Sequence, residues 1–369
     1  MEKYYFTSES VTEGHPDKLA DYISDTILDE CLKQDENSRV AVETFVSKDK
    51  VTIAGQITTK AKINVEEIAR KTVQEIGFDN AETDMDYRNC AIDVNITTQS
   101  PDIAMGVDIG GAGDQGIMFG YASLDTENYM PFAIDMAHQL ARRLTEVRKT
   151  GEIPYLRPDG KTQVTVEYEG DTPKRIETIL ISNQHLAEAN LAQMKKDITE
   201  KVIKAVVPAK YLDENTKIYV NPTGRFVIGG PLGDTGLTGR KIIVDTYGGY
   251  SRNGGGAFSG KDASKVDRSA AYMLRHIAKN LVANGYAKKC EIQVSYAIGM
   301  EQPLSIYVDT FGTSSIPEEQ IVELIKEKFD LSPRGMIEYL DLKKPIYRQT
   351  TNYGHFGKEN LPWEKIIKI

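Results

Sequence analysis

The sequence predicts an α+β protein built from three similar units, each with the element order β-α-β-β-α-β. The chain has 369 residues, more than one ordinary core of about 100–200 residues contains. Hydrophobic residues make up 40% of the chain and charged residues 27%, which is ordinary globular composition. The same run of six elements then recurs three times, and each run has the order of a split βαβ motif.

The first unit begins with a strand at residues 4–7 and a helix over residues 16–34. Apolar residues of this helix recur at steps of four, the spacing of one helix face; they are Leu19, Ile23, Ile27 and Cys31. Another face carries three aspartates, namely Asp21, Asp25 and Asp29. Three elements complete the unit: a hairpin (39–46 and 51–58), a helix (64–77) and a strand (90–97).

The same order returns twice. The second unit consists of a strand (117–122), a helix (131–149), a hairpin (162–168 and 175–182), a helix (186–206) and a strand (217–220). The third consists of a strand (241–246), a helix (263–284), a hairpin (291–297 and 304–311) and a helix (317–329), with a weak closing strand. Because three such runs rarely coincide, we expect three domains, approximately residues 1–105, 106–228 and 229–369. Strands can be exchanged between these domains.

Charge and cysteine content argue against several classes of protein. A net charge of −9 disfavours a nucleic-acid-binding surface. No apolar run approaches the roughly 18–20 residues of a membrane span, and the N-terminal segment lacks the pattern of a signal peptide. Cys31, Cys90 and Cys290 lie far apart without a CxxC motif. We therefore expect reduced thiols, no metal cluster and a cytoplasmic location.

One glycine-rich stretch, residues 223–268, is basic within this acidic protein. Its positive residues are Arg225, Arg240, Lys241, Arg252, Lys261, Lys265 and Arg268. Its negative residues are Asp234, Asp245, Asp262 and Asp267. A local excess of this size indicates a small, highly charged anion as ligand rather than a long polyanion.

Two glycine motifs are similar to nucleotide-binding loops. Residues 111–116 (GAGDQG) match GxGxxG, but a strand follows where a dinucleotide-binding motif requires a helix. We interpret them as a tight turn, or as a turn that presents Asp114 to a ligand. Residues 255–262 (GGAFSGKD) nearly match a P-loop, yet the repeat pattern supplies no parallel sheet.

The second motif still suits a phosphate site. Glycine permits close approach of the backbone, and Lys261 supplies a positive charge. The alternative is a solvated helix start with scattered lysines. A further segment, residues 13–18 (EGHPDK), sets His15, Asp17 and Lys18 at the first turn of a helix. This arrangement suits either a helix cap or a functional site.

Together these segments resemble the bacterial-type S-adenosylmethionine synthetase (methionine adenosyltransferase) family. The resemblance covers nearly the whole chain; its motifs are residues 6–18 (FTSESVTEGHPDK), 111–116, 221–230 (NPTGRFVIGG), 239–241 (GRK), 254–262 (GGGAFSGKD) and 353–357 (YGHFG). It implies three α+β domains around a pseudo-threefold axis, which agrees with the repeat.

The resemblance also implies a reaction. The sulfur of L-methionine attacks C5′ of ATP, and the tripolyphosphate that leaves is hydrolysed to phosphate and pyrophosphate. A thioether needs no base to become a nucleophile, so the enzyme must align the substrates and neutralise an anionic leaving group. Two alternatives stay open: a nucleotide-binding, catalytically weak regulatory paralogue, and an ATP-dependent adenosyltransferase with another nucleophile.

Residue roles follow from matching motifs. The resemblance implies a catalytic set of His15, Lys161, Arg240, Lys261 and Lys265. It implies an ATP site formed by these residues with Asp159 at the ribose, Phe226 and Ile298 at the adenine, and Asp234 and Lys241. It implies a methionine site formed by Gln56, Gln99, Asp114, Asp234 and Lys265.

The resemblance further implies metal ions and subunit contacts. About two Mg²⁺ ions per active site would be held by Asp17 and Asp267, whose oxygens suit a hard cation. A K⁺ ion would lie near Glu43. The active sites would lie between two subunits of a dimer, with a dimer of dimers as the expected assembly. We expect no nucleic-acid or membrane partner.

Three positions depart from the family pattern. Gln56 stands where relatives carry Glu, so a carboxylate expected beside the methionine ammonium is absent. The segment at residues 107–110, part of a loop that gates the site in the family, is shorter than in relatives. Asn253 stands where bacterial relatives commonly carry His. From the first departure we predict weaker methionine binding than in the family.

Overall fold

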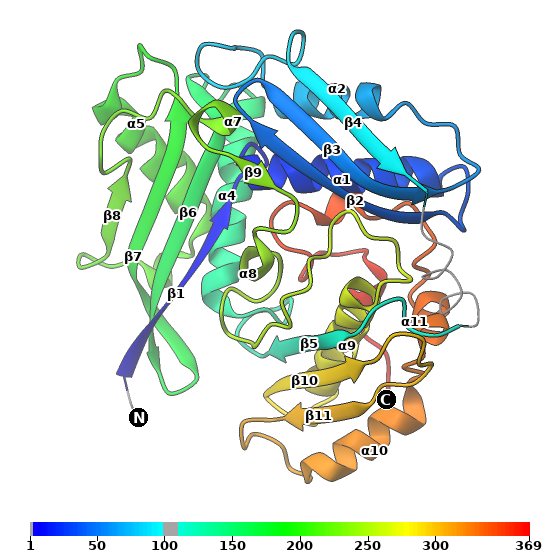
Figure 1. The fold of residues 1–369 in the computed structure, drawn as a ribbon. Coiled ribbons are helices and arrows are strands. Elements are labelled where there is room, and N and C mark those ends of the chain that lie inside the picture. The colour runs from blue at the N-terminus through cyan, green and yellow to red at the C-terminus, as the bar shows by residue number, and fades with distance from the viewer. Residues whose placement is uncertain (1–2, 99–109) are drawn as a thin grey trace.

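The structure of the protein is a computed structural model that describes residues 3–98 and 110–369. Its strands form three sheets, and its long helices pack against them (Figure 1). This arrangement confirms the predicted α+β class. No helix within these described ranges is long and apolar enough to cross a membrane.

Each sheet consists of a hairpin, with strands added at its edges. The first has the order β4 (Ala91–Thr97), β3 (Lys50–Thr58), β2 (Arg39–Ser47) and β9 (Gly236–Leu237). The second has the order β1 (Lys3–Val11), β6 (Leu156–Glu169), β7 (Thr172–His185) and β8 (Lys217–Val220). The third has the order β11 (Ser305–Asp309), β10 (Lys289–Tyr296) and β5 (Gly116–Ser123).

The three units exchange one strand each in a cycle. Strand β1 of the first unit pairs with β6 of the second, and β5 of the second unit pairs with β10 of the third. Strand β9 of the third unit pairs with β2 of the first. Every sheet therefore contains chain from two units, which draws residues distant in sequence to common sheet edges.

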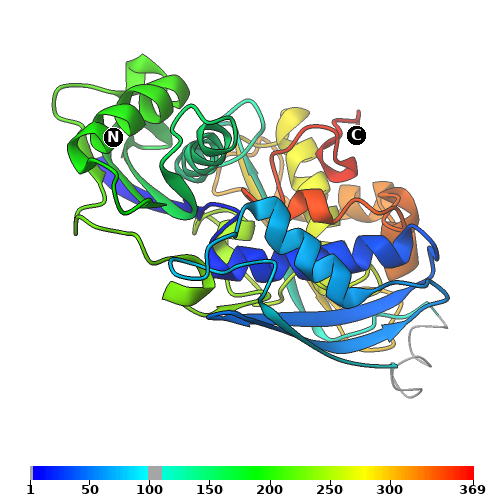
Figure 2. The same ribbon diagram turned by 90° about the horizontal axis from the view of Figure 1, so that it is seen from above.

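One long helix accompanies each sheet. Helix α1 (Pro16–Leu32) packs on β2 and β9, α4 (Phe132–Lys149) packs on β6 and β1, and α9 (Val266–Ala283) packs on β5 and β10. Helix α2 (Val65–Ile76) covers α1, while α10 (Glu318–Lys328) lies beside β11 and α11 (Pro333–Tyr339) beside α9. Figure 2 shows α1 and α2 on the same side of the blue sheet.

Local sequence accounts for the ends of the predicted helices. The side-chain oxygen of Asn64 accepts a hydrogen bond from the backbone N–H of Glu67, which caps α2. Gly77 ends that helix with φ +100°, a conformation that favours glycine. Pro16 occupies the first turn of α1, where its missing N–H costs no helical hydrogen bond. These positions confirm the expected starts and the Gly77 end.

Two predicted elements are wrong in kind. The strand expected at residues 241–246 is a short helix, α8 (Ile242–Asp245), because the side chain of Asp245 turns inward to pair with buried Lys18. The leading strand of the third unit is instead β9, which pairs with β2. The weak closing strand of the third unit is also absent from the described sheets, and α11 follows α10 instead.

The helix expected over residues 186–206 is shorter and interrupted. It consists of α5 (Leu191–Ile198), a π-helical turn (Thr199–Ile203) and α6 (Lys204–Val206). The Nε of Arg143 on α4 donates a hydrogen bond to the carbonyl of Lys201 inside that turn. A side chain that bonds to a helix carbonyl is a common cause of such an irregularity.

Helix α1 is buried on its aspartate face as well as on its apolar face. Asp25 forms a 2.6 Å ion pair with Arg268 of α9, and Asp29 accepts hydrogen bonds from the backbone N–H groups of Tyr347 and Arg348. The side chains of Asp25 and Arg268 are at most 1% exposed. The acidic face therefore binds α9 and the C-terminal segment instead of facing solvent.

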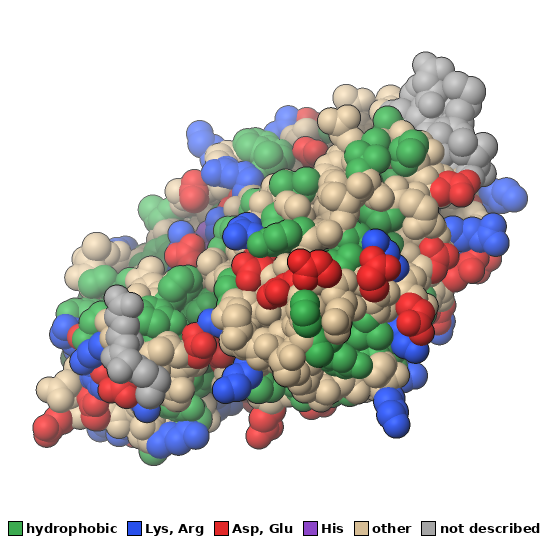
Figure 3. All heavy atoms as spheres, turned by 90° about the horizontal axis from the view of Figure 1, so that it is seen from below, with side chains coloured by type: hydrophobic (Ala, Val, Ile, Leu, Met, Phe, Trp, Pro, Cys, Tyr) green, Lys and Arg blue, Asp and Glu red, His purple; other side chains and the backbone are tan. Residues whose placement is uncertain are grey.

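Buried apolar side chains form two clusters among the described residues. One cluster joins α1, α9 and their two sheets into a common core, and the other fills the space between α4 and the β6–β7 hairpin. The charge of the protein is visible at its surface. Figure 3 shows one end of the molecule, where acidic side chains gather near the middle of a face that also carries basic and apolar side chains.

Candidate active site

The first group of predicted residues gathers at the N-terminal end of α1. His15 caps the helix, and its Nδ1 accepts a 3.1 Å hydrogen bond from the backbone N–H of Asp17. One carboxylate oxygen of Asp17 accepts a hydrogen bond from the N–H of Leu237 at 3.0 Å. The other contacts Nζ of Lys241 at 2.5 Å. The start of α1, β9 and the residue before α8 thus form one cluster, which we call the α1 cluster.

Electrostatics keep His15 neutral. Burial, followed by the nearby charges of Lys241 and Lys161, lowers the pKa of His15 to about 3. Because Nδ1 accepts a backbone N–H, the proton of the neutral ring lies on Nε2. His15 therefore offers an N–H donor at neutral pH. Burial acts to raise the pKa of Asp17, but the hydrogen bonds from Lys241 and Leu237 lower it overall, so its carboxylate is charged.

Residues of β6 and the segment before β9 extend the α1 cluster. Lys161 is exposed and lies opposite Val11, at the end of β1. The buried carboxylate of Asp159 accepts a 2.9 Å hydrogen bond from the N–H of Gly230. Burial raises the pKa of Asp159 to about 6; the charge of Lys161 opposes this rise and that of Asp234 adds to it. Lys161 and Asp234 therefore lie close enough to Asp159 for their charges to affect its pKa.

A second group lies where the glycine segment meets the start of α9. Nζ of Lys261 is 2.7 Å from a carboxylate oxygen of Asp267, and Nζ of Lys265 is 2.5 Å from one of Asp262. A Cβ on Gly256 would lie 2.2 Å from Oδ1 of Asp267, so only glycine allows this approach. We call these four charged residues and the glycine segment 254–256 the α9 cluster.

Strand register adds Gln56 and Glu43 to the surroundings of the α9 cluster. Ala41 of β2 lies opposite Gln56 of β3 and also forms a β-bridge with Lys261. Directly opposed residues point to the same face of a sheet, as do residues two apart on a strand. Glu43, Gln56 and Lys261 therefore share one face of the first sheet. Glu43 is exposed and Gln56 is half-buried.

The two clusters lie along the same edge of β2 but do not touch. Leu237, which contacts Asp17, pairs with Phe45, whereas Lys261 pairs with Ala41. Four residues along a strand span about 13 Å. The two clusters therefore lie beside different positions of β2, an arrangement that suits an extended ligand.

The remaining predicted residues lie apart. Asp114 and Ile298 are exposed on two loops that cross: the N–H of Ala112 donates to the carbonyl of Met300, and that of Gly299 donates to Ala112. Phe226 lies at the end of the second sheet, where its N–H donates to His185. No contact within residues 3–98 and 110–369 joins Phe226 to Ile298. Arg240 is exposed beside Lys241, and Gln99 lies outside the described residues.

Metal ligation can be judged from the carboxylates. The described part of the chain contains no group of three or more His, Cys, Asp and Glu side chains arranged to hold a metal ion. Mg²⁺, however, is commonly bound by one or two carboxylates, with phosphate and water oxygens completing its coordination. Asp17 and Asp267 each present one carboxylate of the type that such a substrate-completed site uses, and each carboxylate is paired with a lysine. Glu43 offers a single exposed carboxylate.

The glycine segment is not a P-loop, as its setting predicted. Helix α9 begins at Val266, and the adjacent strand β5 is antiparallel to its neighbour. Asp262 turns inward and accepts a hydrogen bond from the N–H of Val40 as well as from Lys265. The three-residue spacing of Asp262 and Lys265 is the one local signal for this pair.

Lys18, which the sequence places beside His15 and Asp17 without a role of its own, has a structural one. Its side chain is fully buried and pairs with Asp21, at 2.9 Å, and with Asp245. The three-residue spacing to Asp21 is visible in the sequence, but the contact to α8 is not. Through Asp245 this lysine ties α8, and hence Lys241, to the start of α1.

Comparisons with known proteins agree along the whole chain. Residues 3–101 match the family model of the S-adenosylmethionine synthetase N-terminal domain, residues 109–226 the central domain, and residues 228–365 the C-terminal domain. The S-adenosylmethionine synthase of Clostridium botulinum (strain Alaska E43 / Type E3) is 57% identical over 383 residues, which cover 100% of this chain and 98% of that protein.

The S-adenosylmethionine synthase of Clostridium tetani (strain Massachusetts / E88) is 57% identical over 380 residues, which cover 99% of this chain and 97% of that protein. The match to the first relative spans more positions than this chain has residues, so that relative contains residues without a counterpart here. The chain belongs to the S-adenosylmethionine synthetase family and is a methionine adenosyltransferase, an enzyme that makes S-adenosylmethionine.

Proposed function

We propose that the two clusters hold the triphosphate of ATP while L-methionine attacks its ribose. The observation that carries this proposal is the presence of two lysine–carboxylate pairs, Lys241–Asp17 and Lys261–Asp267, along one sheet edge. A bond forms between the methionine sulfur and C5′, and the bond from C5′ to the triphosphate oxygen breaks. The sulfur becomes a sulfonium, and tripolyphosphate leaves with the electron pair.

Catalysis of this step consists of alignment and charge neutralisation. The Nε2–H of His15 would donate to the oxygen that leaves C5′, a role supported by its neutral tautomer. The phosphate chain would be held by the cationic side chains of Lys161, Arg240, Lys241, Lys261 and Lys265. The same cations would retain tripolyphosphate until water cleaves it to phosphate and pyrophosphate.

We assign the remaining positions to the two organic groups. Asp159 would contact the ribose, and Phe226 and Ile298 would flank the adenine. Methionine would lie near Asp114, on the crossing loops beside Ile298, with Gln56, Gln99, Asp234 and Lys265. The register that aligns Gln56 with Lys261 supports a methionine site next to the phosphate chain.

We propose Mg²⁺ and K⁺ as the metal ions. Asp17 and Asp267 would hold about two Mg²⁺ ions, which would supply positive charge to neutralise the triphosphate. Each lysine that now pairs with an aspartate would then be free to contact phosphate. For K⁺ we propose Glu43, which shares a sheet face with Lys261.

We propose that two copies of the chain complete each active site. The outward faces of the sheets expose large apolar side chains in a soluble fold, including Tyr5, Phe45, Ile117, Tyr219 and Tyr307. Exposed apolar surface of this extent is typical of subunit interfaces. Contact of these faces between two copies would bring Phe226 of one copy towards Ile298 of the other. A dimer of dimers is the proposed assembly, and sedimentation velocity tests it.

Three domains and a cytoplasmic location complete the proposal. We keep the boundaries near residues 105 and 228, which follow the sequence repeat. Three buried cysteines without disulfides support a reducing compartment.

A product assay tests this function directly. With ATP, L-methionine, Mg²⁺ and K⁺, we expect S-adenosylmethionine, phosphate and pyrophosphate in equal amounts. Lys261→Ala should lower kcat/KM for ATP by about 100-fold or more, because a phosphate contact is lost, while Lys326→Ala on exposed α10 should change nothing. Phosphate without S-adenosylmethionine would mean that another nucleophile is used. Bound ATP without product would indicate a regulatory paralogue.

A further inference from the structure

The segment that leads to Lys261 is fixed at both ends. At one end, the hydroxyl of Ser251 and the N–H of Arg252 donate to the buried carboxylate of Glu291 on β10, each at 2.8 Å. At the other end, the guanidinium of Arg268 donates to the carbonyls of Phe258 and Lys261. Residues 253–257 span the gap between these anchors.

Each glycine of this span is restricted: Gly254 and Gly256 have no room for a Cβ, and Gly255 has a positive φ. A Cβ on Gly254 would lie 1.7 Å from the carbonyl oxygen of Ile117 on β5. Gly255 has φ +87°, and a Cβ on Gly256 would lie 2.2 Å from Oδ1 of Asp267. The backbone is thus pressed between β5 and the carboxylate of Asp267. Side-chain contacts that fix this span must therefore come from its non-glycine residues.

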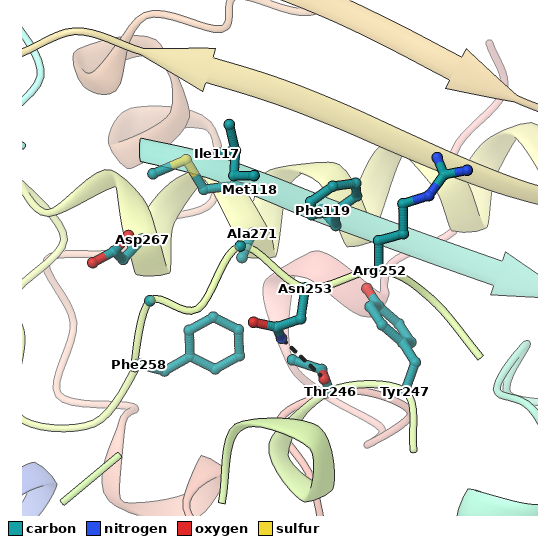
Figure 4. A pocket seen from close by; sticks show the side chains of 12 residues that line it. Ile117, Met118, Phe119, Thr246, Tyr247, Arg252, Asn253, Phe258, Asp267 and Ala271 are labelled. Atoms are coloured by element: carbon teal, nitrogen blue, oxygen red, sulfur yellow. Dashed lines mark hydrogen bonds between the residues drawn. The ribbon is translucent and has the colours of Figure 1, made fainter. Parts of the chain in front are cut away.

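Asn253 makes two such contacts. Its Oδ1 accepts a 2.6 Å hydrogen bond from the N–H of Gly255, and its Nδ2 donates to Oγ1 of Thr246 at 3.5 Å. Thr246 in turn donates to the carbonyl of Ile242 at 2.8 Å. Figure 4 shows Asn253 pointing towards Thr246, with Asp267 on the far side of the same pocket.

These contacts connect the two clusters. Ile242 begins α8 directly after Lys241, whose Nζ contacts Asp17 of the α1 cluster. Gly255 precedes Gly256, which abuts Asp267 of the α9 cluster. Among the described residues, Oδ1 of Asn253 is the one acceptor for the N–H of Gly255. A shorter side chain at position 253 would therefore leave this N–H without a protein partner and loosen the glycine span.

We propose that Asn253 is a positioning residue, which holds the glycine segment against Asp267 and sets the distance between the two lysine–aspartate pairs. This inference rests on the proposed function of those pairs in binding the metal and phosphate. Removal of the Asn253 side chain would leave every metal- and phosphate-binding side chain intact. It would, however, let the Lys261–Asp267 pair move relative to the Lys241–Asp17 pair.

The structure also indicates which substitution preserves this role. His15 uses Nδ1 to accept the N–H of the residue two positions on, the same relation that links Asn253 to Gly255. Histidine at position 253 can therefore accept the Gly255 N–H, whereas alanine cannot. Asn253→His is the conservative variant and Asn253→Ala the disruptive one.

The test compares these variants with the wild-type enzyme in two measurements. Hydrogen exchange of residues 254–257 in the full-length protein, without ligands, should be at least ten-fold faster in Asn253→Ala and unchanged in Asn253→His. In the assay with ATP and methionine, Asn253→Ala should need at least five-fold more Mg²⁺ for half-maximal activity. Asn253→His should stay within two-fold of wild type.

Asn190→Ala is the matched control, because its Oδ1 also accepts a backbone N–H, that of Gln193, but at the start of α5. It should lower Tm without changing the Mg²⁺ requirement. Unchanged exchange in Asn253→Ala, or no recovery in Asn253→His, would overturn the proposal. If Asp267→Asn leaves the Mg²⁺ requirement unchanged, the metal role of Asp267 fails instead, and the exchange measurement still decides the role of Asn253.

Discussion

At the scale of single residues, the site depends on charges whose partners come from elsewhere in the chain. Asp17 is held by Lys241 and Leu237, and Asp267 is held by Lys261 and by the close approach of Gly256. The motifs led us to propose cations and metal-binding carboxylates here, because a polyphosphate leaving group requires both. They did not predict which lysine pairs with which aspartate, since those contacts depend on tertiary structure.

Gln56 allows one test at this scale. Gln56→Glu should lower KM for methionine by about three- to ten-fold, because a carboxylate at this half-buried position gains about 1 kcal/mol with the ammonium group of the substrate. Steady-state kinetics at saturating ATP would measure this change. Gln320→Glu on exposed α10 adds the same charge far from the site and should have no effect. A KM for methionine that is unchanged in Gln56→Glu would contradict the assignment.

Asp159 predicts a pH dependence of stability. Burial raises the pKa of Asp159 to about 6, above the value of about 3.9 for an unfolded chain. Between these values the folded state binds the proton more tightly, so this group adds stability as the pH falls through 6. From pH 7 to pH 5, the free energy of unfolding of the wild type should rise by about 1 kcal/mol relative to that of Asp159→Asn.

Urea unfolding at the two pH values would measure this difference. Glu214→Gln removes an exposed carboxylate and should leave the pH dependence of the wild type intact. If the free energy of unfolding of the wild type falls relative to that of Asp159→Asn between pH 7 and pH 5, Asp159 is not protonated in this range.

At the scale of secondary-structure elements, close packing decides what the local sequence does not. The hairpins and the capped helices followed from alternation, turns and caps, which act within a few residues. Local sequence did not predict helix α8 or the π-helical turn, because each depends on a partner from another element. The partner is Lys18 for α8 and Arg143 for the turn. The contact of β5 with α9 is a further case, since Gly120 faces the helix backbone there.

Gly120→Ala should therefore be strongly destabilising. Its added Cβ would lie 2.2 Å from the backbone carbon of Leu274 on α9, and a helix backbone cannot yield as a side chain can. We expect a loss of about 3 kcal/mol in the free energy of unfolding. Gly285→Ala is the comparison, because a Cβ there meets nothing within 4 Å and only the φ of +80° is unfavourable.

For Gly285→Ala we expect a loss of about 1–2 kcal/mol. Denaturant unfolding of both variants would measure the two losses. Equal losses would mean that α9 shifts to accommodate the added methyl group at position 120.

At the scale of the whole molecule, the cyclic exchange of strands ties the three units together. Each sheet contains a strand from another unit, and one apolar core joins α1 and α9. No unit can unfold without breaking a sheet of its neighbour. The protein should therefore unfold cooperatively, although its length would allow three independent transitions.

The single tryptophan tests this cooperativity. Trp363 is fully buried, its ring lies 3.9 Å from that of Tyr272, and its Nε1 donates to the carbonyl of His355. Its fluorescence reports the C-terminal part, whereas far-UV circular dichroism reports all three sheets. Urea transitions followed by the two signals should coincide. A fluorescence transition displaced from the circular dichroism transition would show that the C-terminal part unfolds separately.

Local patterns in the sequence were enough to predict the α+β class, the threefold repeat, and most hairpins and helices. These depend on periodicity, turns and motifs that act over short distances. Tertiary structure alone shows the strand exchange, the burial of the aspartate face of α1, and the gathering of charged residues into two clusters beside β2. These depend on contacts such as Asp17 with Lys241, which join residues more than two hundred positions apart and leave no local pattern.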